Sequence, residues 1–314
     1  MAHKVFIDGQ YGTTGLQIQQ RLEAHPNVDL LTIALDQRRN ALLRDECLNE
    51  ADVVFLCLPD DAAREATGLV TNPNTVIIDA SSAHRVSPDW VYGIPELPGQ
   101  RERLRNSNRI ANPGCYPTGM TLLTKPLVDA DLIPRDYPLA VHAITGYSGG
   151  GKAMIADYKS RSGAELEDIA ARPKNLDLMH KHIPEMQRIP GFQFPPVFVP
   201  TVGNFEQGMI VQVPLHTRLL GGPATVLHET LAATYGGEPF VHLFPLNDQS
   251  QLEEGFLRPT ACNGTNRIEL FVYAADNGLI MLMARLDNLG KGASGAAVQN
   301  MNLRLGLDES TGLL

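Results

Sequence analysis

The sequence predicts an α/β protein in which a Rossmann-type parallel-sheet domain is joined to an α+β catalytic domain built on a large mixed sheet. Three observations support this fold class. Apolar strands alternate with helices through the first eighty residues, a glycine-rich loop follows the first strand, and the pattern is mostly β from Val197 onward. A length of 314 residues suits two domains better than one or three.

The first part of the chain is expected to form a parallel sheet with right-handed crossover helices. Its strands are nearly all apolar rather than alternating, as in sheets that helices cover on both faces. The expected strands are 4–8, 29–35, 52–58 and 75–79, and the expected helices are 14–24, 40–49 and 60–70.

The pattern changes after Pro113. A helix is expected near Pro117, with proline in its first turn, and residues 155–196 are interpreted as an insertion of helices and loops. Further strands are expected at 139–145, 197–202, 209–215, 239–245 and 267–286, with helices at 223–235 and 294–305. Since no linker or repeat is evident, we predict a dinucleotide-binding domain of residues 1–118 and 290–314 and a catalytic and dimerisation domain of residues 119–289, with a ligand cleft between them.

Composition excludes several classes of function. A net charge of -9 argues against a nucleic-acid or membrane-surface binder, although an anionic small ligand needs only local positive charge. Four scattered cysteines without a CxxC pair predict neither a disulfide scaffold nor a zinc site, so we expect no metal. Neither a signal-peptide pattern nor an apolar run of the ~20 residues that a membrane span needs is present, so a cytoplasmic protein is expected.

The loop after the first strand has the spacing GxxGxxG. Its predicted cofactor-binding residues are Gly9, Gly12, Thr13, Thr14 and Gly15. Glycines at these places permit a tight turn and close approach of the backbone to a pyrophosphate, which the N-terminus of the following helix would stabilise. The spacing alone also fits an ordinary glycine turn, but its setting between strand and helix favours a dinucleotide.

The residues after the second strand leave the choice of dinucleotide open. Asp36 suits the free ribose hydroxyl of NAD, whereas Arg38 and Arg39 suit the 2'-phosphate of NADP.

Cys115 is the candidate nucleophile. It follows Pro113-Gly114 in a turn before a predicted helix, where helix amides and the helix dipole would lower the pKa of a thiol from about 8.5. Cys57 lies in a buried strand, and Cys47 and Cys262 lie on a polar helix and in a polar loop. A nicotinamide site with a cysteine nucleophile indicates acyl chemistry at the aldehyde level through a thioester.

Such chemistry needs an acid/base group and an anion site. His180 and His182 form the densest polar cluster with Glu185, and a metal held by these three lacks an evident fourth ligand. His84 and Arg85 are expected at the carboxyl edge of the parallel sheet, where ligands bind.

A glycine-rich run offers a second anion site. Ser148, Gly149 and Lys152 could hold a phosphate or carboxylate with backbone amides and an ammonium, although the run also fits a flexible turn.

Several segments together resemble the N-acetyl-gamma-glutamyl-phosphate reductase family, in its shorter form, which is related to aspartate-semialdehyde dehydrogenases. The segments are 9–15, 79–85, 92–97, 112–118, 148–152, 182–185, 287–293 and 297–300. The most specific are Pro-Gly-Cys-Tyr-Pro-Thr, 113–118, and Asn-Leu-Gly-Lys-Gly-Ala, 288–293.

The resemblance implies NADPH-dependent reduction of N-acetyl-gamma-glutamyl phosphate in arginine biosynthesis. It implies that Cys115 forms the thioester and that His182 is the acid/base group. Gly12, Thr13 and Ser81 would line the cofactor, with Asn288 and Lys291 near its nicotinamide end. The substrate would be bound by Arg85, Asn112, Ser148, Gly149, Lys152 and Glu185. A homo-oligomer, dimer or tetramer, is expected, with the apolar strands 267–286 as a possible interface.

Three alternatives stay open. An aspartate-semialdehyde dehydrogenase or an aminoadipyl-phosphate reductase would share the fold, and one methylene between such substrates is worth only about 1–3 kcal/mol. A non-catalytic nucleotide sensor would need only the first loop, so the presence of Cys115, His182 and the segment 148–152 argues against it.

Overall fold

A computed structural model describes residues 2–37 and 40–313. By its contacts the chain divides into two compact units. Unit 1 comprises the chain up to Pro95, Gly99–Gly114 and everything from Ala293 onward, and unit 2 comprises Glu96–Pro98 and Cys115–Gly292. No helix in the described part of the chain combines the length and the apolar character that a membrane span requires.

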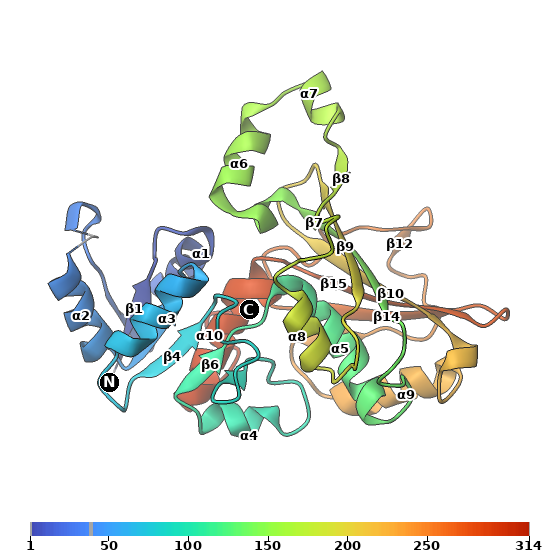
Figure 1. The fold of residues 1–314 in the computed structure, drawn as a ribbon, viewed down its shortest axis with the longest axis horizontal. Coiled ribbons are helices and arrows are strands. Elements are labelled where there is room, and N and C mark those ends of the chain that lie inside the picture. Colours follow the sequence, from blue (N-terminus) through green and yellow to red (C-terminus); the bar gives the residue numbers. More distant parts are fainter. Residues whose placement is uncertain (1, 38–39, 314) are drawn as a thin grey trace. The chain divides into compact units, whose positions relative to one another are not determined.

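Unit 1 is built on a six-stranded sheet in which every pairing is parallel (Figure 1). The strand order is β2-β1-β3-β4-β6-β5. The strands are β1 (His3–Asp8), β2 (Val28–Leu31), β3 (Val53–Leu56), β4 (Val76–Asp79), β5 (Val91–Tyr92) and β6 (Arg109–Ala111). β3 and β4 are buried at every position, as expected for a sheet covered on both faces.

The helices of unit 1 follow the predicted alternation. They are α1 (Thr13–Glu23), α2 (Ala41–Glu50), α3 (Asp60–Leu69), α4 (Gln100–Arg105) and α10 (Gly295–Arg304). Asn40 caps α2, since its side chain accepts from the amides of Leu42 and Leu43. α10 comes from the far end of the chain, after a π-helical turn at Gly290–Ser294, and packs on α1, α4 and β4.

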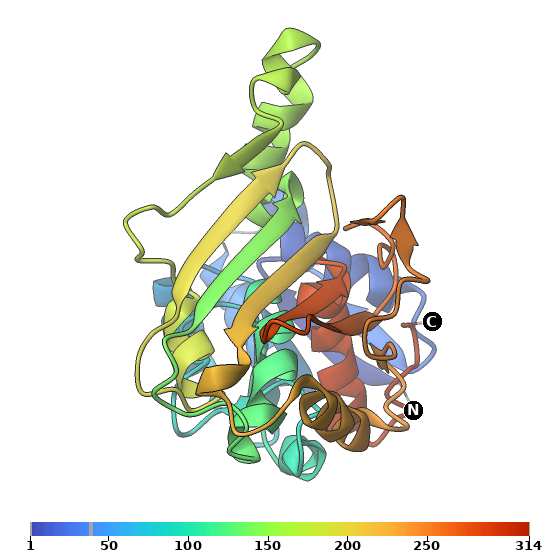
Figure 2. The ribbon, with the colours of Figure 1, turned by 90° about the vertical axis from the view of Figure 1, so that its right-hand side faces the viewer.

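Unit 2 is built on a seven-stranded mixed sheet of order β11-β14-β15-β10-β7-β9-β8. Its strands are β7 (Ala140–Gly146), β8 (Ala171–Pro173), β9 (Val197–Gly203), β10 (Met209–His216), β11 (Val241–Leu243), β14 (Ile268–Ala274) and β15 (Leu279–Leu286). β7 pairs with β9 in parallel and with β10 antiparallel, and Figure 2 shows these three long strands side by side. A separate small hairpin joins β12 (Leu252–Glu253) and β13 (Phe256–Leu257).

The helices of unit 2 are α5 (Cys115–Asp129), α6 (Gly151–Ser160), α7 (Ala164–Glu167), α8 (Ile183–Arg188) and α9 (Ala224–Tyr235). α5 packs on β10, β15, α8 and α9, so the helix that begins at Cys115 is held on the sheet along its length. The hydroxyl of Tyr235 on α9 donates to the carbonyl of Leu122 on α5 (2.6 Å).

The structure corrects several details of the prediction. β2 ends at Leu31, and Leu35–Gln37 forms a 3-10 turn instead of continuing the strand. β3 ends at Leu56, so Cys57 follows the strand rather than lying inside it. The short elements β5, β6 and α4 were not predicted, because segments of two to six residues have too few positions to show a hydrophobic period.

Candidate active site

The glycine loop between β1 and α1 makes its turn by close approach of backbone to backbone. Gly9 has a φ of +88°, and a Cβ there would overlap the carbonyl of Cys57. A Cβ on Gly15 would overlap the carbonyl oxygen of Gly9, which also accepts the amide of Gly12 (2.9 Å). The three glycines of the predicted motif therefore have physical roles, and Gly12 forms the N-cap of α1 with no side chain in the way of a ligand.

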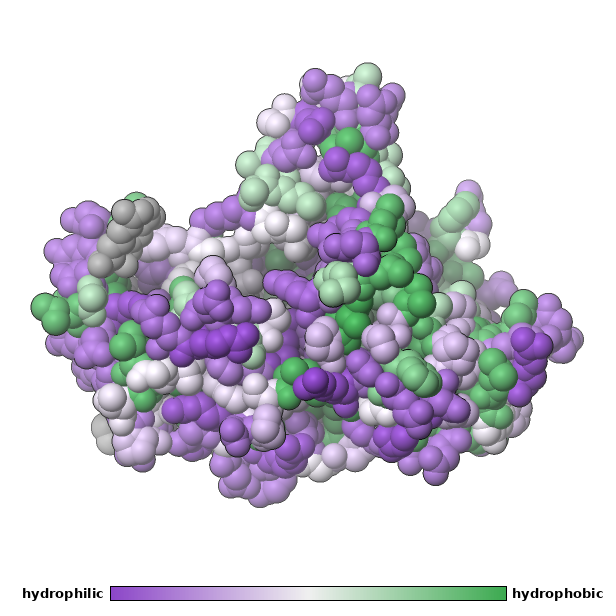
Figure 3. Space-filling view, in the orientation of Figure 1, coloured by the Kyte–Doolittle hydropathy of each residue, from purple (hydrophilic) through white to green (hydrophobic). Residues whose placement is uncertain are grey.

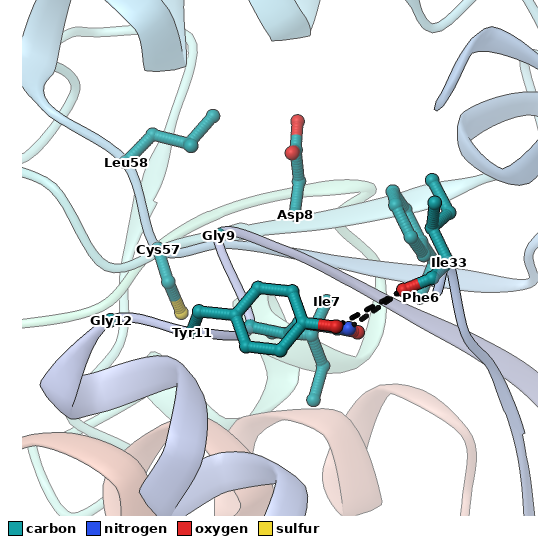
Figure 4. A pocket seen from close by; sticks show the side chains of 10 residues that line it. Phe6, Ile7, Asp8, Gly9, Tyr11, Gly12, Ile33, Cys57 and Leu58 are labelled. Atoms are coloured by element: carbon teal, nitrogen blue, oxygen red, sulfur yellow. Dashed lines mark hydrogen bonds between the residues drawn. The ribbon is translucent and has the colours of Figure 1, made fainter. Parts of the chain in front are cut away.

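A pocket of about 360 Å³ opens beside this loop, within unit 1 (Figure 4). The pocket lies at the carboxyl ends of β1 and β3. In the sheet, β2 lies on one side of β1 and β3 on the other, so the strand order changes direction between β1 and β3. Open parallel sheets bind nucleotides at such switch points. Its lining residues are Phe6, Ile7, Asp8, Gly9, Gln10, Tyr11, Gly12, Ile33, Cys57 and Leu58.

Two side chains of the loop span this pocket. Gln10 Nε2 and Tyr11 Oη both donate to the carbonyl oxygen of Ile33 (3.1 and 3.2 Å), as the dashed lines in Figure 4 show. Sequence reasoning missed both, since nothing in GxxGxxG assigns work to the intervening residues. Asp36 lies just beyond, exposed in the 3-10 turn, and Arg38 and Arg39 lie outside the described residues.

Ser81 and His84 surround the carboxylate of Asp79 at the end of β4. Ser81 Oγ donates to Asp79 Oδ2 (2.8 Å), and His84 Nδ1 is 2.7 Å from the same oxygen. The His84 ring stacks on Trp90 with ring centroids 4.1 Å apart. His84 is therefore buried and held on both sides, which suits a structural group better than a mobile acid/base group.

Arg85 and Asn112 are connected within unit 1. Arg85 Nε donates to the carbonyl of Asn112 and its Nη2 to the carbonyl of Ala80, both at 3.0 Å. Asn112 Nδ2 donates to the carbonyl of Ala293, and Asn112 Oδ1 accepts from Asn300 (3.3 Å). Asn112 is 1% exposed, so the segment that leads to Cys115 is firmly fixed at this point.

Cys115 is the first residue of α5 rather than a turn residue ahead of it. The first amides of a helix have no intrahelical acceptor, so the sulfur lies where the helix is electropositive. Gly292 packs against this cysteine, because a Cβ on Gly292 would lie 2.8 Å from the Cβ of Cys115. Sequence reasoning missed this role of Gly292, which only the fold brings next to the cysteine.

His182 lies in an aromatic cluster beside the residue that follows the cysteine. The ring of Tyr116 has its centroid 5.7 Å from those of both His180 and His182, and the two imidazoles are 4.7 Å apart. His180 Nδ1 accepts the backbone amide of His182 (3.1 Å), which places the donor proton of a neutral His180 on Nε2. Burial, more than the nearby Cys115, holds the pKa of Tyr116 well above its usual value, so its phenol stays protonated.

The glycine-rich run after β7 forms a 3-10 turn, Tyr147–Gly150, that continues into α6. Its first two amides are not available to an anion, since Tyr147 and Ser148 donate to the carbonyls of Phe205 and Glu206. Ser148 Oγ instead accepts from Asn288 Nδ2 (3.0 Å), and Asn288 Oδ1 accepts the amide of Gly208 (2.8 Å). The structure thus joins two predicted site residues, Ser148 and Asn288, in one buried network.

The remaining predicted residues of unit 2 lie in different surroundings. Gly149 and Lys152 are exposed, Lys152 in the first turn of α6, while Glu185 is 2% exposed on α8. Lys291 is 1% exposed and its ammonium is 2.5 Å from Glu96 Oε1. A cofactor contact was predicted for Lys291, and the structure gives its charge a protein partner.

No group of three or more His, Cys, Asp or Glu side chains suited to a metal ion exists among residues 2–37 and 40–313. The cysteines other than Cys115 have unreactive surroundings. Burial raises the pKa of all three, in Cys262 to about 12. Cys262 lies in a loop, as predicted, and is fully buried there, with its thiol 3.5 Å from the carbonyl of Arg285.

Comparisons with known proteins agree with this geometry. Residues 4–107 match the family described as semialdehyde dehydrogenase, NAD binding domain, and residues 115–288 match semialdehyde dehydrogenase, dimerisation domain. A protein of Nostoc sp. named N-acetyl-gamma-glutamyl-phosphate reductase 2 is 48% identical over 319 residues, covering 99% of each chain. The N-acetyl-gamma-glutamyl-phosphate reductase of Brucella ovis is 48% identical over 311 residues, covering 98% of this chain and 100% of its own.

This chain belongs to the N-acetyl-gamma-glutamyl-phosphate reductase family. The resemblance inferred from motifs is thereby confirmed, as is the combination of a Rossmann-type sheet with a mixed sheet. Solved structures share the reductase's fold at low identity. Aspartate semialdehyde dehydrogenase II of Vibrio cholerae, complexed with ASA, is 19% identical with a TM-score of 0.72, covering 98% of this chain and 99% of its own. A probable aspartate-semialdehyde dehydrogenase of Pseudomonas aeruginosa is 15% identical with a TM-score of 0.73, covering 97% and 99%.

Proposed function

We propose that this reductase-family protein catalyses the NADPH-dependent reduction of N-acetyl-gamma-glutamyl phosphate to N-acetylglutamate semialdehyde and phosphate. The observation that carries the proposal is Cys115 at the first position of α5, in a chain whose other unit has a glycine loop and a switch-point pocket. Close relatives named for this activity, at 46–49% identity along nearly the whole chain, support this substrate over the aspartate and aminoadipate analogues.

In the proposed reaction, Cys115 forms a thioester with the substrate and His182 transfers a proton. The Cys115 thiolate attacks the acyl carbon, the C–O bond to phosphate breaks, and a thioester forms with release of phosphate. NADPH, when bound, supplies the hydride that reduces the thioester carbon. The C–S bond then breaks, the aldehyde leaves and Cys115 regains the thiolate. We assign to His182 the role of giving a proton to the oxygen of the tetrahedral intermediate and taking it back when the C–S bond breaks. The His182 ring contacts the ring of Tyr116, the residue next to the nucleophile.

The remaining assignments are part of the same proposal. The glycine loop, Ser81, Arg38 and Arg39 would bind the cofactor, with Asn288 and Lys291 toward its nicotinamide end. Arg85, Asn112, Ser148, Gly149, Lys152 and Glu185 would bind the acyl phosphate. The domains would be 1–118 with 290–314, and 119–289.

The test is a steady-state assay in the reverse direction, which follows phosphate-dependent reduction of NADP by N-acetylglutamate semialdehyde. Cys115→Ser should abolish turnover, whereas the matched control Cys47→Ser should keep it, because Cys47 lies within α2 and does not line the pocket beside the glycine loop. Full turnover in Cys115→Ser would remove the nucleophile from the proposal. Faster turnover of aspartate or aminoadipate semialdehyde would replace the substrate, and nucleotide binding without any turnover would indicate the sensor.

The acid/base assignment has its own comparison. His182→Asn should lower turnover and leave NADPH binding intact, while His84→Asn should act mainly on stability, because His84 is bonded to Asp79 inside unit 1. Loss of turnover in a stable His84→Asn protein, with none in His182→Asn, would reverse the assignment.

We also propose a cytoplasmic homo-oligomer. The matched domain in unit 2 is described as a dimerisation domain. Large apolar side chains are exposed on the segment around β8 and β9, including Leu176 (71%), Met179 (79%) and Phe194 (58%), and Figure 3 shows an apolar area over β9. Such areas are typical of interfaces. Light scattering that reports only monomer at micromolar concentration would exclude the oligomer.

A further inference from the structure

A carboxylate lines the pocket that would receive the anionic cofactor. Asp8 is the last residue of β1 and directly precedes Gly9, and Figure 4 shows its side chain extending from the strand end beside the loop. Only 10% of this side chain is exposed. A negative charge at this place repels a pyrophosphate. The glycine loop attracts the pyrophosphate only through its backbone amides and the dipole of α1, so the repulsion by Asp8 weakens binding.

Arg44 lies against this carboxylate. It is on α2, and both its Nε (2.9 Å) and its Nη2 (2.8 Å) contact Asp8 Oδ2. The Arg44 side chain is 23% exposed, so the pair is partly shielded from water. Its Nη1 is also 3.5 Å from Glu65 Oε1, but the Glu65 side chain is 68% exposed and its charge is largely screened by solvent.

The charge of Asp8 also affects Cys57, which lines the same pocket. Burial is the main cause that raises the pKa of the Cys57 thiol, and Asp79 and Asp8 add to it. Among the described residues that line the pocket, Asp8 is the acidic one, and the cation that contacts it is Arg44.

We propose that Arg44 sets the charge of the cofactor pocket by neutralising Asp8, and that it thereby removes a repulsion that would weaken binding of the more highly charged NADPH more than binding of NADH. This inference rests on the proposed function, because it assumes that a nicotinamide dinucleotide binds at the glycine loop. Arg44 acts through Asp8 and is a positioning residue rather than a cofactor contact. The additional phosphate of NADPH is at its adenosine end, the end that this type of loop and the segment after the second strand receive.

The test measures nucleotide binding and not turnover. Titration of the wild-type enzyme and its variants with NADPH or NADH, followed by nucleotide fluorescence without acyl substrate, gives a Kd for each. Arg44→Gln should weaken binding of NADPH about tenfold and binding of NADH about threefold, since one unpaired charge at a distance on the order of 10 Å from a phosphate has an effect of this size. Arg105→Gln, which removes an equal charge from the exposed face of α4, should change neither Kd more than about twofold.

The second half of the test separates neutralisation from direct contact. Asp8→Asn should bind NADPH more tightly than the wild type, because the charge of Arg44 is then uncompensated, and Asp8→Asn combined with Arg44→Gln should recover most of the affinity that Arg44→Gln loses. The difference in NADPH affinity between the wild type and Arg44→Gln should be smaller in 0.5 M salt, because salt screens the charge of Asp8. If Arg44→Gln does not fold, Asp8→Asn alone still decides, because it must strengthen NADPH more than NADH.

Three results would overturn the inference. The first is an unchanged Kd for NADPH in folded Arg44→Gln. The second is an equal loss of affinity for NADPH and for NADH in that variant. The third is a double variant, Asp8→Asn with Arg44→Gln, that binds NADPH as weakly as Arg44→Gln alone. A wild-type enzyme that binds neither nucleotide would instead overturn the proposed function, so the two failures are distinguishable.

Discussion

Replacing Lys291 by Met should destabilise unit 2 strongly. The Lys291 ammonium lies 2.5 Å from Glu96 Oε1 and 5.6 Å from the centroid of the Phe240 ring. The side chains of Lys291 and Glu96 are only 2% and 0% exposed. Met keeps most of the volume of Lys and removes the charge, so the Glu96 carboxylate would stay buried without the cation that compensates it.

Breaking a buried ion pair from one side costs about 3–5 kcal/mol, because the remaining charge has lost water as well as its partner. For a unit of about 180 residues this corresponds to a fall in Tm of about 6–20 °C. Glu96→Gln combined with Lys291→Met should recover most of the loss, since neither buried side chain is then charged.

Urea unfolding followed by circular dichroism measures this effect. The control is Lys125→Met, which breaks an i,i+4 pair with Asp129 on the surface of α5 and should cost under about 0.5 kcal/mol. An unfolding free energy of Lys291→Met within 1 kcal/mol of the wild type would refute the reasoning. So would a double variant no more stable than Lys291→Met. If stability were unchanged and NADPH binding were lost, Lys291 would be a cofactor contact alone, as the sequence motif implied.

Three further changes have distinct expected results. Gly15→Ala should abolish nucleotide binding and lower the free energy of unfolding by about 1–3 kcal/mol, because the added Cβ overlaps the Gly9 carbonyl. Its control is Gly68→Ala on α3, where nothing lies within 4 Å of the added Cβ, and this variant should gain up to about 1 kcal/mol of stability. Equal effects of the two variants in calorimetry would contradict this. Burial lowers the pKa of His25 below 6.5, and its Nδ1 accepts the amide of Asn27. The unfolded chain therefore binds the proton first as the pH falls below 6.5, so stability present at neutral pH should decrease there, and urea titrations of His25→Gln should show a smaller decrease. Tyr235→Phe should cost about 1–2 kcal/mol by removing the bond to the Leu122 carbonyl, and a free energy of unfolding equal to that of the wild type would show that the bond is not needed.

Much of the fold was predictable because its signals are local. The helix expected at 40–49 and the strand expected at 52–58 each have their signal within a few residues, and the structure has α2 and β3 there. The boundaries were less accurate. After Leu31 the apolar residues continue, but the chain leaves the sheet for a 3-10 turn, and composition alone does not show where pairing stops.

The candidate site was predictable where motif and position coincide, as at Cys115 and the glycine loop. It was not predictable where partners are far apart in the chain. Lys291 is bonded to a carboxylate 195 positions away, and Asn288 to a serine 140 positions away. Arg44 on a polar helix has nothing in its own neighbourhood to connect it with Asp8, because only the packing of α2 on β1 brings them together. Local patterns report helices and turns, whereas pairings of buried charge depend on the finished fold.

Unit 1 cannot finish folding until the C-terminal part of the chain has been synthesised, because it contains α10. Its sheet is complete once β6 has been made, but α10 follows about 180 residues later, and nine of its ten residues are buried. At about 5–20 residues per second the ribosome needs roughly 10–40 s to cover that distance. Until then, the surface of α1, α4 and β4 that α10 covers is exposed to water and to other nascent chains. A fragment that ends before Gly295 should therefore need a chaperone or aggregate, even though it contains the whole glycine loop.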